Sequence, residues 1–343
     1  MQPLRVVIDG RPLVGNRTGI GVHTAEIARR LPFAPAPLIA SHAPIENRDG
    51  IERCEFDVRP YPLGILWQQL ALPRIGGDVL WGPHGTLPVT PRKPSVVTLH
   101  DFSSITMMQR HKLRTILSFD LFIGRSLEQA DRIAAVSTAV ADEAIRGFAV
   151  DARKIEIVPN GVDEFFSPGG DGSRDYILFV GTLEPRKGLE HLVSVWWSLP
   201  LPRPRLVFCG DRGWRTRIAE LPGIEWTGFV SRERLRDLYR GALMFVYPSQ
   251  YEGFGIPPLE AMACGAPTIA TRTGAIPEYA GDAALLVDRG DRDQLREAMM
   301  RLLTDRPFRD DLAARGAQRA TTYRWDASAK TMTDLLVEAA RCV

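Results

Sequence analysis

Short apolar runs alternate along the whole chain with longer stretches in which apolar residues recur every three or four positions. The short runs have the length of β-strands, and the longer stretches have the period of amphipathic helices. Strands that alternate with helices are typical of parallel sheets built from βαβ units. The pattern therefore predicts an α/β protein.

The alternation stops once and then starts again, which predicts two domains. In the first half we expect strands at 5–9, 38–41, 78–81, 95–99 and 132–136, and helices at 22–31 and 113–130. Proline, asparagine and glycine are frequent in residues 158–172, which favours a linker there. In the second half we expect strands at 176–181, 205–209, 224–227, 243–247 and 267–270.

Helical signals in the second half lie between these strands. Helices are expected at 188–197, from a cap at Ser231 to Gly241, at the two prolines Pro257 and Pro258, and at 291–303. The predicted architecture is two Rossmann-like domains, 1–165 and 166–326, whose parallel sheets face across a cleft. An amphipathic helix at 327–343 has no strand of its own, so we expect it to pack back on the first domain. Ligands of such sheets bind at the carboxyl ends of the strands.

The composition is that of a globular protein and narrows the function. Of the 343 residues, 45% are hydrophobic and 24% are charged, which suits two domains of ordinary size. The net charge is +2 with no basic tail, which counts against nucleic-acid binding. No apolar run is long enough to span a bilayer, and a strand begins almost at the first residue, so we expect neither a transmembrane helix nor a signal peptide.

The chain shows no metal-binding or disulfide pattern. The cysteines, Cys54, Cys209, Cys264 and Cys342, lie far apart without a Cys-x-x-Cys pair, which fits a reducing cytoplasm. The only Asp-x-Asp triplet is Asp291-Arg-Asp293. It starts a predicted helix after a turn, so we interpret it as a helix N-cap rather than a metal site.

The most informative segment is the turn between the strand at 243–247 and the double proline. Glu252 and Glu260 bracket it, and a Gly-Phe-Gly sequence lies between them. Free backbone N–H groups at a helix start suit an anion such as phosphate, whereas carboxylates would repel that anion and more readily bind neutral hydroxyls. By itself Glu260 could simply favour the positive end of the helix dipole. The combination instead describes a site for a sugar nucleotide.

These segments together resemble the family 4 glycosyltransferases, which are retaining enzymes with the two-domain GT-B fold. The resemblance covers nearly the whole chain and is most specific at Glu252-x7-Glu260 within SQYEGFGIPPLEAMACGAPTIAT. It continues in Gly181-Thr-Leu-Glu-Pro-Arg186-Lys187-Gly188, in Gly228-Phe-Val230 and in His100-Asp101 at a strand end. The opening Asp9-Gly-Arg-Pro-Leu13 with Gly19-Ile-Gly21 is most similar to the mannosyltransferases that build bacterial O-antigen chains.

The resemblance implies a role for each matched residue. Glu252 would contact the donor sugar, Glu260 would accept hydrogen bonds from the ribose, and His100 would bind a hydroxyl near C6 of the sugar. Arg186 and Lys187 would take the place of a metal ion and stabilise the charge of the departing diphosphate. Further donor contacts are expected at Gly253, Phe254, Gly255, Ile256, Val230, Gly19 and Gly21.

Structural roles stay open for some of these residues. His100 would otherwise be an ordinary histidine at a strand end, and Arg186 and Lys187 a solvated pair of charges. The glycines at 15, 19 and 21 are interpreted as a loop that approaches the diphosphate and the acceptor. They do not form a dinucleotide fingerprint, because Thr24 replaces its last glycine and no acidic residue closes the next strand.

One further stretch suits a membrane surface. Residues 107–132 mix basic side chains with large apolar ones; the basic residues are Arg110, His111, Lys112, Arg114 and Arg125. With Trp67 and the apolar residues at 62–72, this stretch would suit a bilayer that carries a lipid-linked acceptor. The competing interpretation, which we favour, is a helix packed on the core with a solvated basic face.

The predicted function is the retaining, metal-independent transfer of a hexose, with GDP-mannose favoured as donor, to a growing bacterial polysaccharide. The acceptor would be a saccharide or a lipid-linked saccharide. The enzyme would be cytoplasmic, with peripheral contact with the inner membrane, and would need no cofactor. The alternatives are a UDP-hexose or GDP-rhamnose donor, a Rossmann-type nicotinamide oxidoreductase, and a non-catalytic scaffold.

Overall fold

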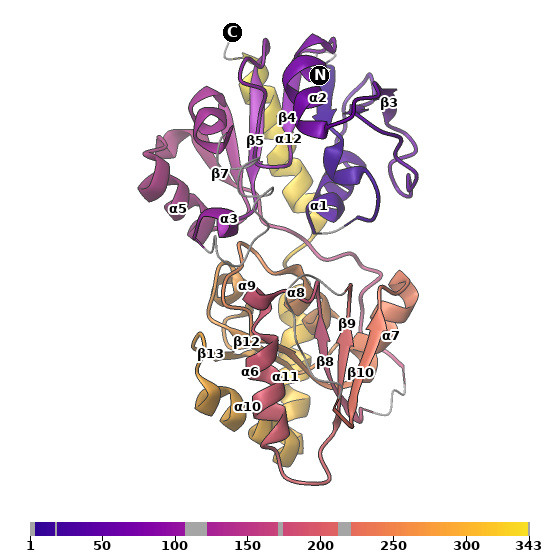
Figure 1. The fold of residues 1–343 in the computed structure, drawn as a ribbon, viewed down its shortest axis with the longest axis vertical. Coiled ribbons are helices and arrows are strands. Elements are labelled where there is room, and N and C mark those ends of the chain that lie inside the picture. Colours follow the sequence, from indigo (N-terminus) through magenta and orange to yellow (C-terminus); the bar gives the residue numbers. More distant parts are fainter. Residues whose placement is uncertain (1–3, 18, 107–121, 171–173, 212–220, 342–343) are drawn as a thin grey trace. The chain divides into compact units, whose positions relative to one another are not determined.

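The structure is a computed structural model, and it describes residues 4–17, 19–106, 122–170, 174–211 and 221–341. The chain divides into two compact units, which can be followed by colour in Figure 1. Unit 1 consists of Met1–Gly161 and Trp325–Val343, and unit 2 of Val162–Arg324. Each unit is built around one parallel sheet, which confirms the α/β class that the alternation predicted.

The sheet of unit 1 has 7 strands in the order β3-β2-β1-β4-β5-β6-β7. The strands are β1 (Val6–Asp9), β2 (Leu38–Ser41), β3 (Glu55–Val58), β4 (Val79–Gly82), β5 (Ser95–Leu99), β6 (Arg132–Ala135) and β7 (Ile155–Ile157). The central strands β1, β2, β4 and β5 consist of buried residues. The outer strands β3 and β7 contain partly exposed residues, and they lack the apolar run that predicted the others.

Helices pack against this sheet and complete unit 1. They are α1 (Gly19–Ala28), α2 (Gly64–Leu70), α3 (Ser103–Thr106), α5 (Thr138–Phe148) and α12 (Trp325–Arg341). The C-terminal helix α12 packs against α1 and against the strands β4, β5 and β6. Its residues Met332 and Leu336 are fully buried, so the last helix of the chain completes the core of unit 1.

The sheet of unit 2 has 6 strands in the order β10-β9-β8-β11-β12-β13. The strands are β8 (Tyr176–Val180), β9 (Arg205–Cys209), β10 (Ile224–Gly228), β11 (Ala242–Tyr247), β12 (Thr268–Thr271) and β13 (Leu285–Val287). The helices are α6 (Leu189–Trp197), α7 (Arg232–Gly241), α8 (Ile256–Ala263), α9 (Ile276–Ala280), α10 (Arg292–Thr304) and α11 (Arg306–Ala320). The sequence pattern did not predict the short strand β13 or the helix α11.

The strand order reverses at one place in each sheet. In unit 1, β1 pairs with β2 on one side and with β4 on the other. In unit 2, β8 pairs with β9 and with β11. Loops that leave the carboxyl ends of such neighbouring strands diverge, and ligands of parallel sheets bind in the crevice between them. A ligand-binding site in unit 2 is therefore expected at the loops after β8 and β11.

Two of the three glycines predicted to form a loop after β1 lie in a helix instead, whereas Gly15 lies in a bend outside any helix or strand. Gly19 and Gly21 lie in the first turn of α1, which begins three residues before the predicted start of this helix at residue 22. A Cβ atom on Gly21 would lie 2.6 Å from the carbonyl oxygen of Pro12. Glycine at this position therefore allows the helix to pack closely on the 3₁₀ turn at Arg11–Leu13, which is a structural reason for its presence.

Two predicted helix caps are confirmed. The Ser231 side chain accepts a hydrogen bond from the backbone N–H of Arg234 at the start of α7. The Asp291 side chain accepts one from the backbone N–H of Gln294 at 2.9 Å, at the start of α10. A side-chain oxygen at this position satisfies a helix N–H that has no partner within the helix. The Asp-x-Asp triplet therefore begins with a capping residue.

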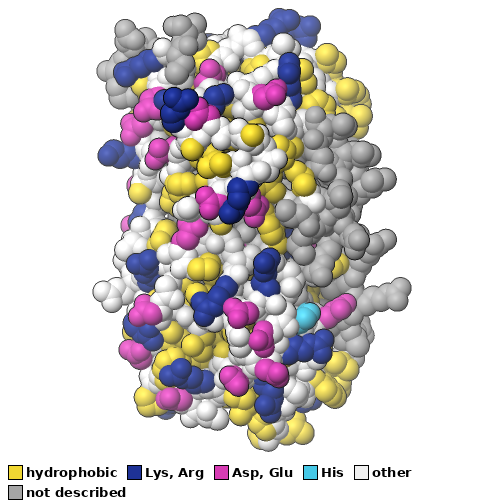
Figure 2. Space-filling model, turned by 90° about the vertical axis from the view of Figure 1, so that its left-hand side faces the viewer, with side chains coloured by type: hydrophobic (Ala, Val, Ile, Leu, Met, Phe, Trp, Pro, Cys, Tyr) yellow, Lys and Arg dark blue, Asp and Glu magenta, His cyan; other side chains and the backbone are white. Residues whose placement is uncertain are grey.

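The surface carries both signs of charge. Figure 2 shows basic and acidic side chains interspersed over the face that it draws, with hydrophobic side chains between them. No helix of the described residues is long and apolar enough to cross a membrane. The basic residues Arg110, His111, Lys112 and Arg114 lie outside the described residues, so the membrane-surface interpretation of that stretch stays a prediction. The assignment of Trp67 to the same surface is wrong, because its side chain is fully buried.

Candidate functional site

A cluster of charged residues lies at the carboxyl ends of β8 and β11, where the strand order of unit 2 reverses. Arg186 and Lys187 lie in the 3₁₀ turn Pro185–Lys187 that follows β8. Glu252 follows β11. The fold thus brings together three of the predicted site residues, although Lys187 and Glu252 are 65 positions apart in the chain.

Glu252 is the centre of this cluster and is only 8% exposed. Its Oε1 atom accepts hydrogen bonds from Lys187 Nζ and from Ser249 Oγ, both at 2.5 Å. The Tyr247 hydroxyl donates to the same oxygen at 3.0 Å, and an Arg186 guanidinium nitrogen lies 3.4 Å from it. These partners all meet Oε1, and Oε2 forms no hydrogen bond with any described residue.

The charges of the cluster stabilise one another. Burial alone would raise the pKa of the Glu252 carboxyl, but the positive charges of Lys187 and Arg186 and the hydrogen bonds from Lys187 and Ser249 outweigh burial and lower it. For Lys187, burial and the neighbouring Arg186 lower the pKa, and Glu252 offsets part of that effect. Glu252 is therefore a carboxylate held between two cations.

The sequence did not predict the two polar side chains that support Glu252. Lys187 Nζ donates a hydrogen bond to the Tyr247 hydroxyl at 2.7 Å, so this hydroxyl links the cation to the carboxylate. Burial and the charge of Glu252 raise the pKa of Tyr247 well above its usual value, which keeps the hydroxyl protonated. Tyr247 ends the apolar strand β11 and Ser249 lies in the loop after it, and neither position carries a distinctive sequence signal.

Backbone contacts fix the loops that carry the cluster. The N–H of Gln250 donates to the carbonyl of Arg186 at 2.8 Å, which joins the loops after β8 and β11. The N–H of Glu252 donates to Thr273 Oγ1 at 3.3 Å, which adds the loop after β12. A Cβ atom on Gly274 would lie 2.1 Å from the carbonyl oxygen of Glu252, so only glycine permits this close approach.

The Gly-Phe-Gly turn opens α8 as predicted. Gly255 is the N-cap of α8 in a left-handed conformation, with φ 82°. Its carbonyl accepts a hydrogen bond from the Tyr279 hydroxyl at 2.8 Å. Phe254 is 4% exposed and packs against the Tyr279 ring, so its side chain belongs to the core. The predicted donor contacts at Gly253, Phe254, Gly255 and Ile256 would accordingly involve the backbone.

Glu260 lies on α8, and its carboxyl group is in a different environment from that of Glu252. Its Oε2 atom accepts a hydrogen bond from the buried Tyr239 hydroxyl at 2.9 Å. Burial raises the pKa of Glu260 to about 7, although the bond from Tyr239 and the charge of Arg232 act in the opposite direction. The two glutamates that look alike in the sequence therefore differ in charge state near neutral pH. Val230, another predicted donor contact, is partly exposed just after β10.

His100 belongs to unit 1, where it follows β5. Its Nε2 atom lies 2.9 Å from the carbonyl oxygen of Pro83, which can only accept, so Nε2 carries the proton. Burial lowers the pKa of His100 to about 4, and the ring is neutral at physiological pH. In this tautomer Nδ1 is an acceptor, which suits a hydroxyl group and excludes His100 as a resident cation.

Unit 1 has a polar cluster that the sequence did not predict as a site. Asp9 ends β1, is fully buried and pairs with Arg11 at 2.7 Å. The Gln68 side chain reaches the same carboxylate at 3.4 Å, and it donates to Thr86 Oγ1 at 3.1 Å. The cluster lies at the carboxyl ends of β1 and β4, where the order of this sheet reverses. The motif Asp9-Gly-Arg11 signalled the family but gave no sign of these contacts.

A metal site is not apparent among the residues that the structure describes. They contain no group of three or more His, Cys, Asp or Glu side chains that could hold a metal ion. Asp291 is engaged as a helix cap. The described cysteines Cys54, Cys209 and Cys264 are free thiols.

Comparisons with known protein families match most of the chain. The model for Glycosyltransferase Family 4 matches residues 17–164, and the model for Glycosyl transferases group 1 matches residues 163–319. Together the two models cover the cluster at Glu252 and every strand of both sheets except β1.

Curated relatives include enzymes of polysaccharide synthesis. The O-antigen chain mannosyltransferase B of Escherichia coli is 28% identical over 94% of this chain and 97% of its own length. A serotype-specific mannosyltransferase of the same organism, WbdA, is 32% identical over 57% of this chain. The match to WbdA spans only 24% of that longer protein.

Solved structures establish the fold. The Anabaena protein Alr3699/HepE, solved in complex with UDP-glucose, superposes with a TM-score of 0.80 over 98% of this chain and 100% of its own. The sequence identity is 17%, so the likeness concerns the fold alone. The predicted GT-B architecture, with two Rossmann-like units, is thereby confirmed.

Proposed function

Since the chain belongs to the family 4 glycosyltransferases, which use nucleotide sugars, we propose that it transfers mannose from GDP-mannose to a bacterial polysaccharide. The transfer would retain the anomeric configuration and need no metal ion. Unit 2 would bind the donor, and unit 1 would bind a saccharide or lipid-linked saccharide acceptor. The observation that carries the proposal is the buried cluster of Glu252, Lys187 and Arg186, which lies where the strand order of unit 2 reverses.

The two cations suit a departing diphosphate. Breaking the bond between a sugar and a phosphate builds negative charge on the leaving group, and fixed cations in a closed site stabilise it. Lys187 is 6% exposed and Arg186 is held by Glu184 and Glu252, so neither needs to reorganise during the reaction. We propose that they do the work of the divalent ion that metal-dependent transferases use.

The remaining polar groups suit the hydroxyls of the donor. Oε2 of Glu252 has no partner among the described residues, while its Oε1 is held in place by Lys187 and Ser249. A free carboxylate oxygen on a fixed side chain can accept from a sugar hydroxyl. Nδ1 of His100 can accept in the same way, and Glu260 would accept from the ribose.

The proposed binding site for the acceptor consists of residues of unit 1. Asp9 and Arg11 form a fixed polar pair that can hydrogen-bond to sugar hydroxyls. On α2, the side chains of Leu66 and Leu70, with Leu63 just before the helix, are 41–46% exposed. Exposed leucines beside a polar cluster suit an acceptor whose saccharide is attached to a lipid. Peripheral contact with the inner membrane is part of this proposal.

The proposal of mannose as the donor sugar rests on the similar proteins, and other donor sugars remain as alternatives. O-antigen mannosyltransferases match the chain, which supports GDP-mannose. The complex of HepE with UDP-glucose favours the alternative of a UDP-hexose, and a GDP-rhamnose donor would need the same residues. Membership of the family counts against a nicotinamide oxidoreductase, as does Thr24 at the position of the last glycine of a dinucleotide fingerprint.

A thermal-shift panel with GDP, UDP, ADP and NAD, each with and without EDTA, tests the donor. A ligand at about 100 times its dissociation constant adds roughly 2.7 kcal/mol of stability, enough to raise the midpoint by several degrees. We expect GDP to raise the midpoint equally with and without EDTA. A shift with UDP alone would indicate a UDP-hexose as the donor in place of GDP-mannose. Loss of the shift in EDTA would contradict the metal-free mechanism.

Transfer itself is tested with labelled GDP-mannose and a lipid extract from a polysaccharide-producing bacterium. We expect label in the lipid or polysaccharide fraction, and an α-linked product would support retention. A protein that binds GDP but transfers no sugar to such acceptors would favour the scaffold alternative.

A further inference from the structure

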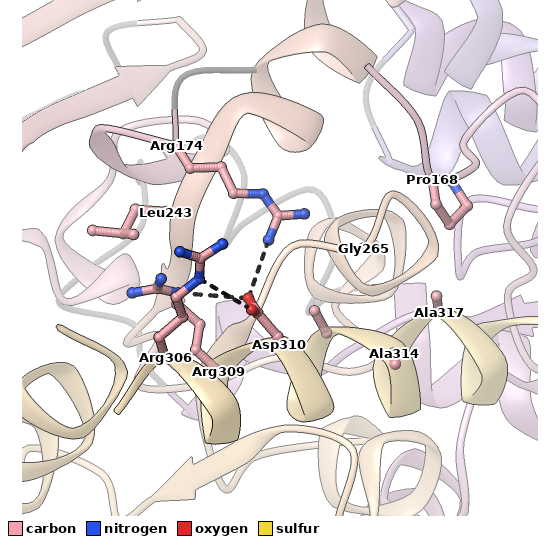
Figure 3. A pocket seen from close by; sticks show the side chains of 10 residues that line it. Pro168, Arg174, Leu243, Gly265, Arg306, Arg309, Asp310, Ala314 and Ala317 are labelled. Atoms are coloured by element: carbon pink, nitrogen blue, oxygen red, sulfur yellow. Dashed lines mark ion pairs between the residues drawn. The ribbon is translucent and has the colours of Figure 1, made fainter. Parts of the chain in front are cut away.

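A second charged pocket lies in unit 2, separate from the cluster at Glu252 (Figure 3). Its volume is about 680 Å³, which lies in the range of small-molecule sites. The charged side chains that line it are Arg174, Arg306, Arg309 and Asp310. Its apolar wall includes Leu243 and Ala314.

The pocket lies at the opposite edge of the sheet from the proposed donor site. Arg174 precedes β8 by two positions, and Leu243 is the second residue of β11. The cluster at Glu252 follows the carboxyl ends of these same strands. Strands of five and six residues separate the two edges by about 15–20 Å. A ligand in one place therefore does not occupy the other.

One carboxylate faces three guanidinium groups in this pocket. Arg306 Nε lies 3.5 Å from Asp310 Oδ2, and Arg174 and Arg309 lie 3.8 and 4.0 Å from Oδ1. Figure 3 shows the three arginines directed toward Asp310 from α11 and from the segment before β8. These distances exceed those of well-formed hydrogen bonds. The pocket thus carries a net positive charge and guanidinium donors that Asp310 does not fully use.

Arg309 shows the shortage of acceptors most clearly. Its side chain is 13% exposed, and one terminal nitrogen donates to the carbonyl of Leu302 at 2.9 Å. Its Nε atom is buried and has no hydrogen-bond partner among the described residues. A buried donor without an acceptor is unfavourable, so an anion that replaced Asp310 beside it would gain a hydrogen bond.

We propose that this pocket binds the phosphate group of a small phosphomonoester. Guanidinium groups bind phosphate oxygens through paired, charge-assisted hydrogen bonds, and three of them converge here. Asp310 is half exposed, so its side chain can turn toward solvent when the phosphate enters. Leu243 and the alanines of α11 provide an apolar wall for the organic part. This site is independent of the proposed transferase activity.

The test is isothermal titration of the full chain with a hexose 6-phosphate at low salt, in the Lys187→Ala background. That background weakens phosphate binding at the proposed donor site and leaves the second pocket intact. We expect binding to persist in it and to weaken at least about tenfold when Arg174 and Arg306 are both replaced by alanine. Arg292→Ala removes an exposed charge of α10 and should leave the affinity unchanged.

The Asp310→Asn variant should change the affinity for the phosphomonoester in the opposite direction. It therefore distinguishes an effect on binding from an effect on folding. Removal of the competing carboxylate should tighten binding of the phosphomonoester, whereas a purely structural ion cluster would only lose thermal stability. Weaker binding by this variant, or equal isotherms for the parent and the double arginine variant, would overturn the proposal.

Inorganic phosphate and the unphosphorylated hexose distinguish the two parts of the ligand. We expect the hexose 6-phosphate to bind more tightly than inorganic phosphate, and the free hexose not to bind. If inorganic phosphate bound as tightly as the ester, the apolar wall would have no role and the ester assignment would be wrong.

Discussion

Single residues acquire their properties in this protein from what surrounds them. Glu252 and Glu260 are both carboxylates near the start of α8, yet the pKa of Glu252 is lowered by two cations and that of Glu260 is raised by burial to about 7. A carboxylate beside fixed cations can hold a sugar without repelling the diphosphate. The different surroundings of the two glutamates thus fit the different roles that the family resemblance implies.

Replacement of Lys187 by alanine tests the electrostatic role at this scale. We expect the rate of sugar transfer to fall by at least about 10², the size of effect seen when one fixed electrostatic stabiliser is lost. The measurement is kcat under saturating donor. Lys330→Ala, which removes an exposed lysine of α12, serves as the matched control and should transfer sugar normally.

Circular dichroism must accompany this comparison, because Lys187 also neutralises a buried carboxylate. A folded Lys187→Ala protein with near-normal kcat would refute the assigned role. A folded protein that loses transfer and binds GDP more weakly would place Lys187 at the leaving diphosphate.

The raised pKa of Glu260 predicts a pH dependence of stability. Because the folded state holds the Glu260 proton up to about pH 7 and the unfolded state releases it near 4.5, the free energy of unfolding should fall as pH rises between these values. Glu260→Gln removes that slope. Urea titrations at pH 5 and pH 8 should show equal stability at pH 5 and a more stable variant at pH 8. A variant that is less stable at pH 8 would contradict the shift.

At the scale of elements, the site depends on loops that touch through their backbones. The loops after β8, β11 and β12 join through the bonds from Gln250 and Glu252. Gly188 likewise allows two loops to approach closely, because a Cβ atom there would lie 2.1 Å from the carbonyl oxygen of Pro248. The strands fix where the loops begin, and the glycines allow the loops to meet.

Gly274→Ala tests this loop contact. The new Cβ would lie 2.1 Å from the Glu252 carbonyl oxygen, so the Glu252 loop must move and donor affinity should fall at least about tenfold, since a misplacement of 1 Å can cost far more in rate. Gly281→Ala is a matched control, because its φ of 55° is almost the same and a Cβ there meets nothing within 4 Å.

Both glycine variants should lose stability, because each glycine has a positive φ that a residue with a Cβ atom rarely adopts. Only Gly274→Ala should lose donor binding, measured by isothermal titration with GDP. Equal losses of binding in the two variants would mean that backbone strain, rather than the contact with Glu252, is responsible.

For the whole molecule, the chain crosses between the units twice, so the last helix belongs to the unit of the first strand. Helix α12 packs on α1, β4, β5 and β6, which are all elements of unit 1. Unit 1 therefore depends on residues from both ends of the chain. Unit 2 is one continuous segment.

Leu336→Ala tests this division. Leu336 is fully buried on α12, and its truncation should cost about 2–5 kcal/mol. Hydrogen exchange should then accelerate in β4, β5 and β6, while the protection of β8 and β11 and its increase with GDP stay unchanged. The exposed Asp334→Ala on the same helix should change neither unit. Accelerated exchange throughout both units would show that they unfold together.

Local patterns in the sequence were sufficient for much of the fold. A strand that is buried on both faces must be apolar, so β1, β2, β5, β8 and β9 appear as apolar runs, and Ser231 and Asp291 signal helix starts because caps act within one turn. The sparsely buried edge strands β3 and β7 escaped prediction. Gly19 and Gly21 were assigned to a loop because the contact of Gly21 with Pro12 lies outside any local pattern.

The sequence by itself determined the two α/β halves, the family and the residues after the strands that carry chemistry. Only the tertiary structure decided that Lys187 meets Glu252, that burial raises the pKa of Glu260 to about 7, and that Arg174 shares a pocket with Arg306 and Arg309. Periodicity and capping act between neighbours in the chain and can be found in the order of the residues. Ion pairing and burial depend on distances in space, which arise only when the sheets assemble.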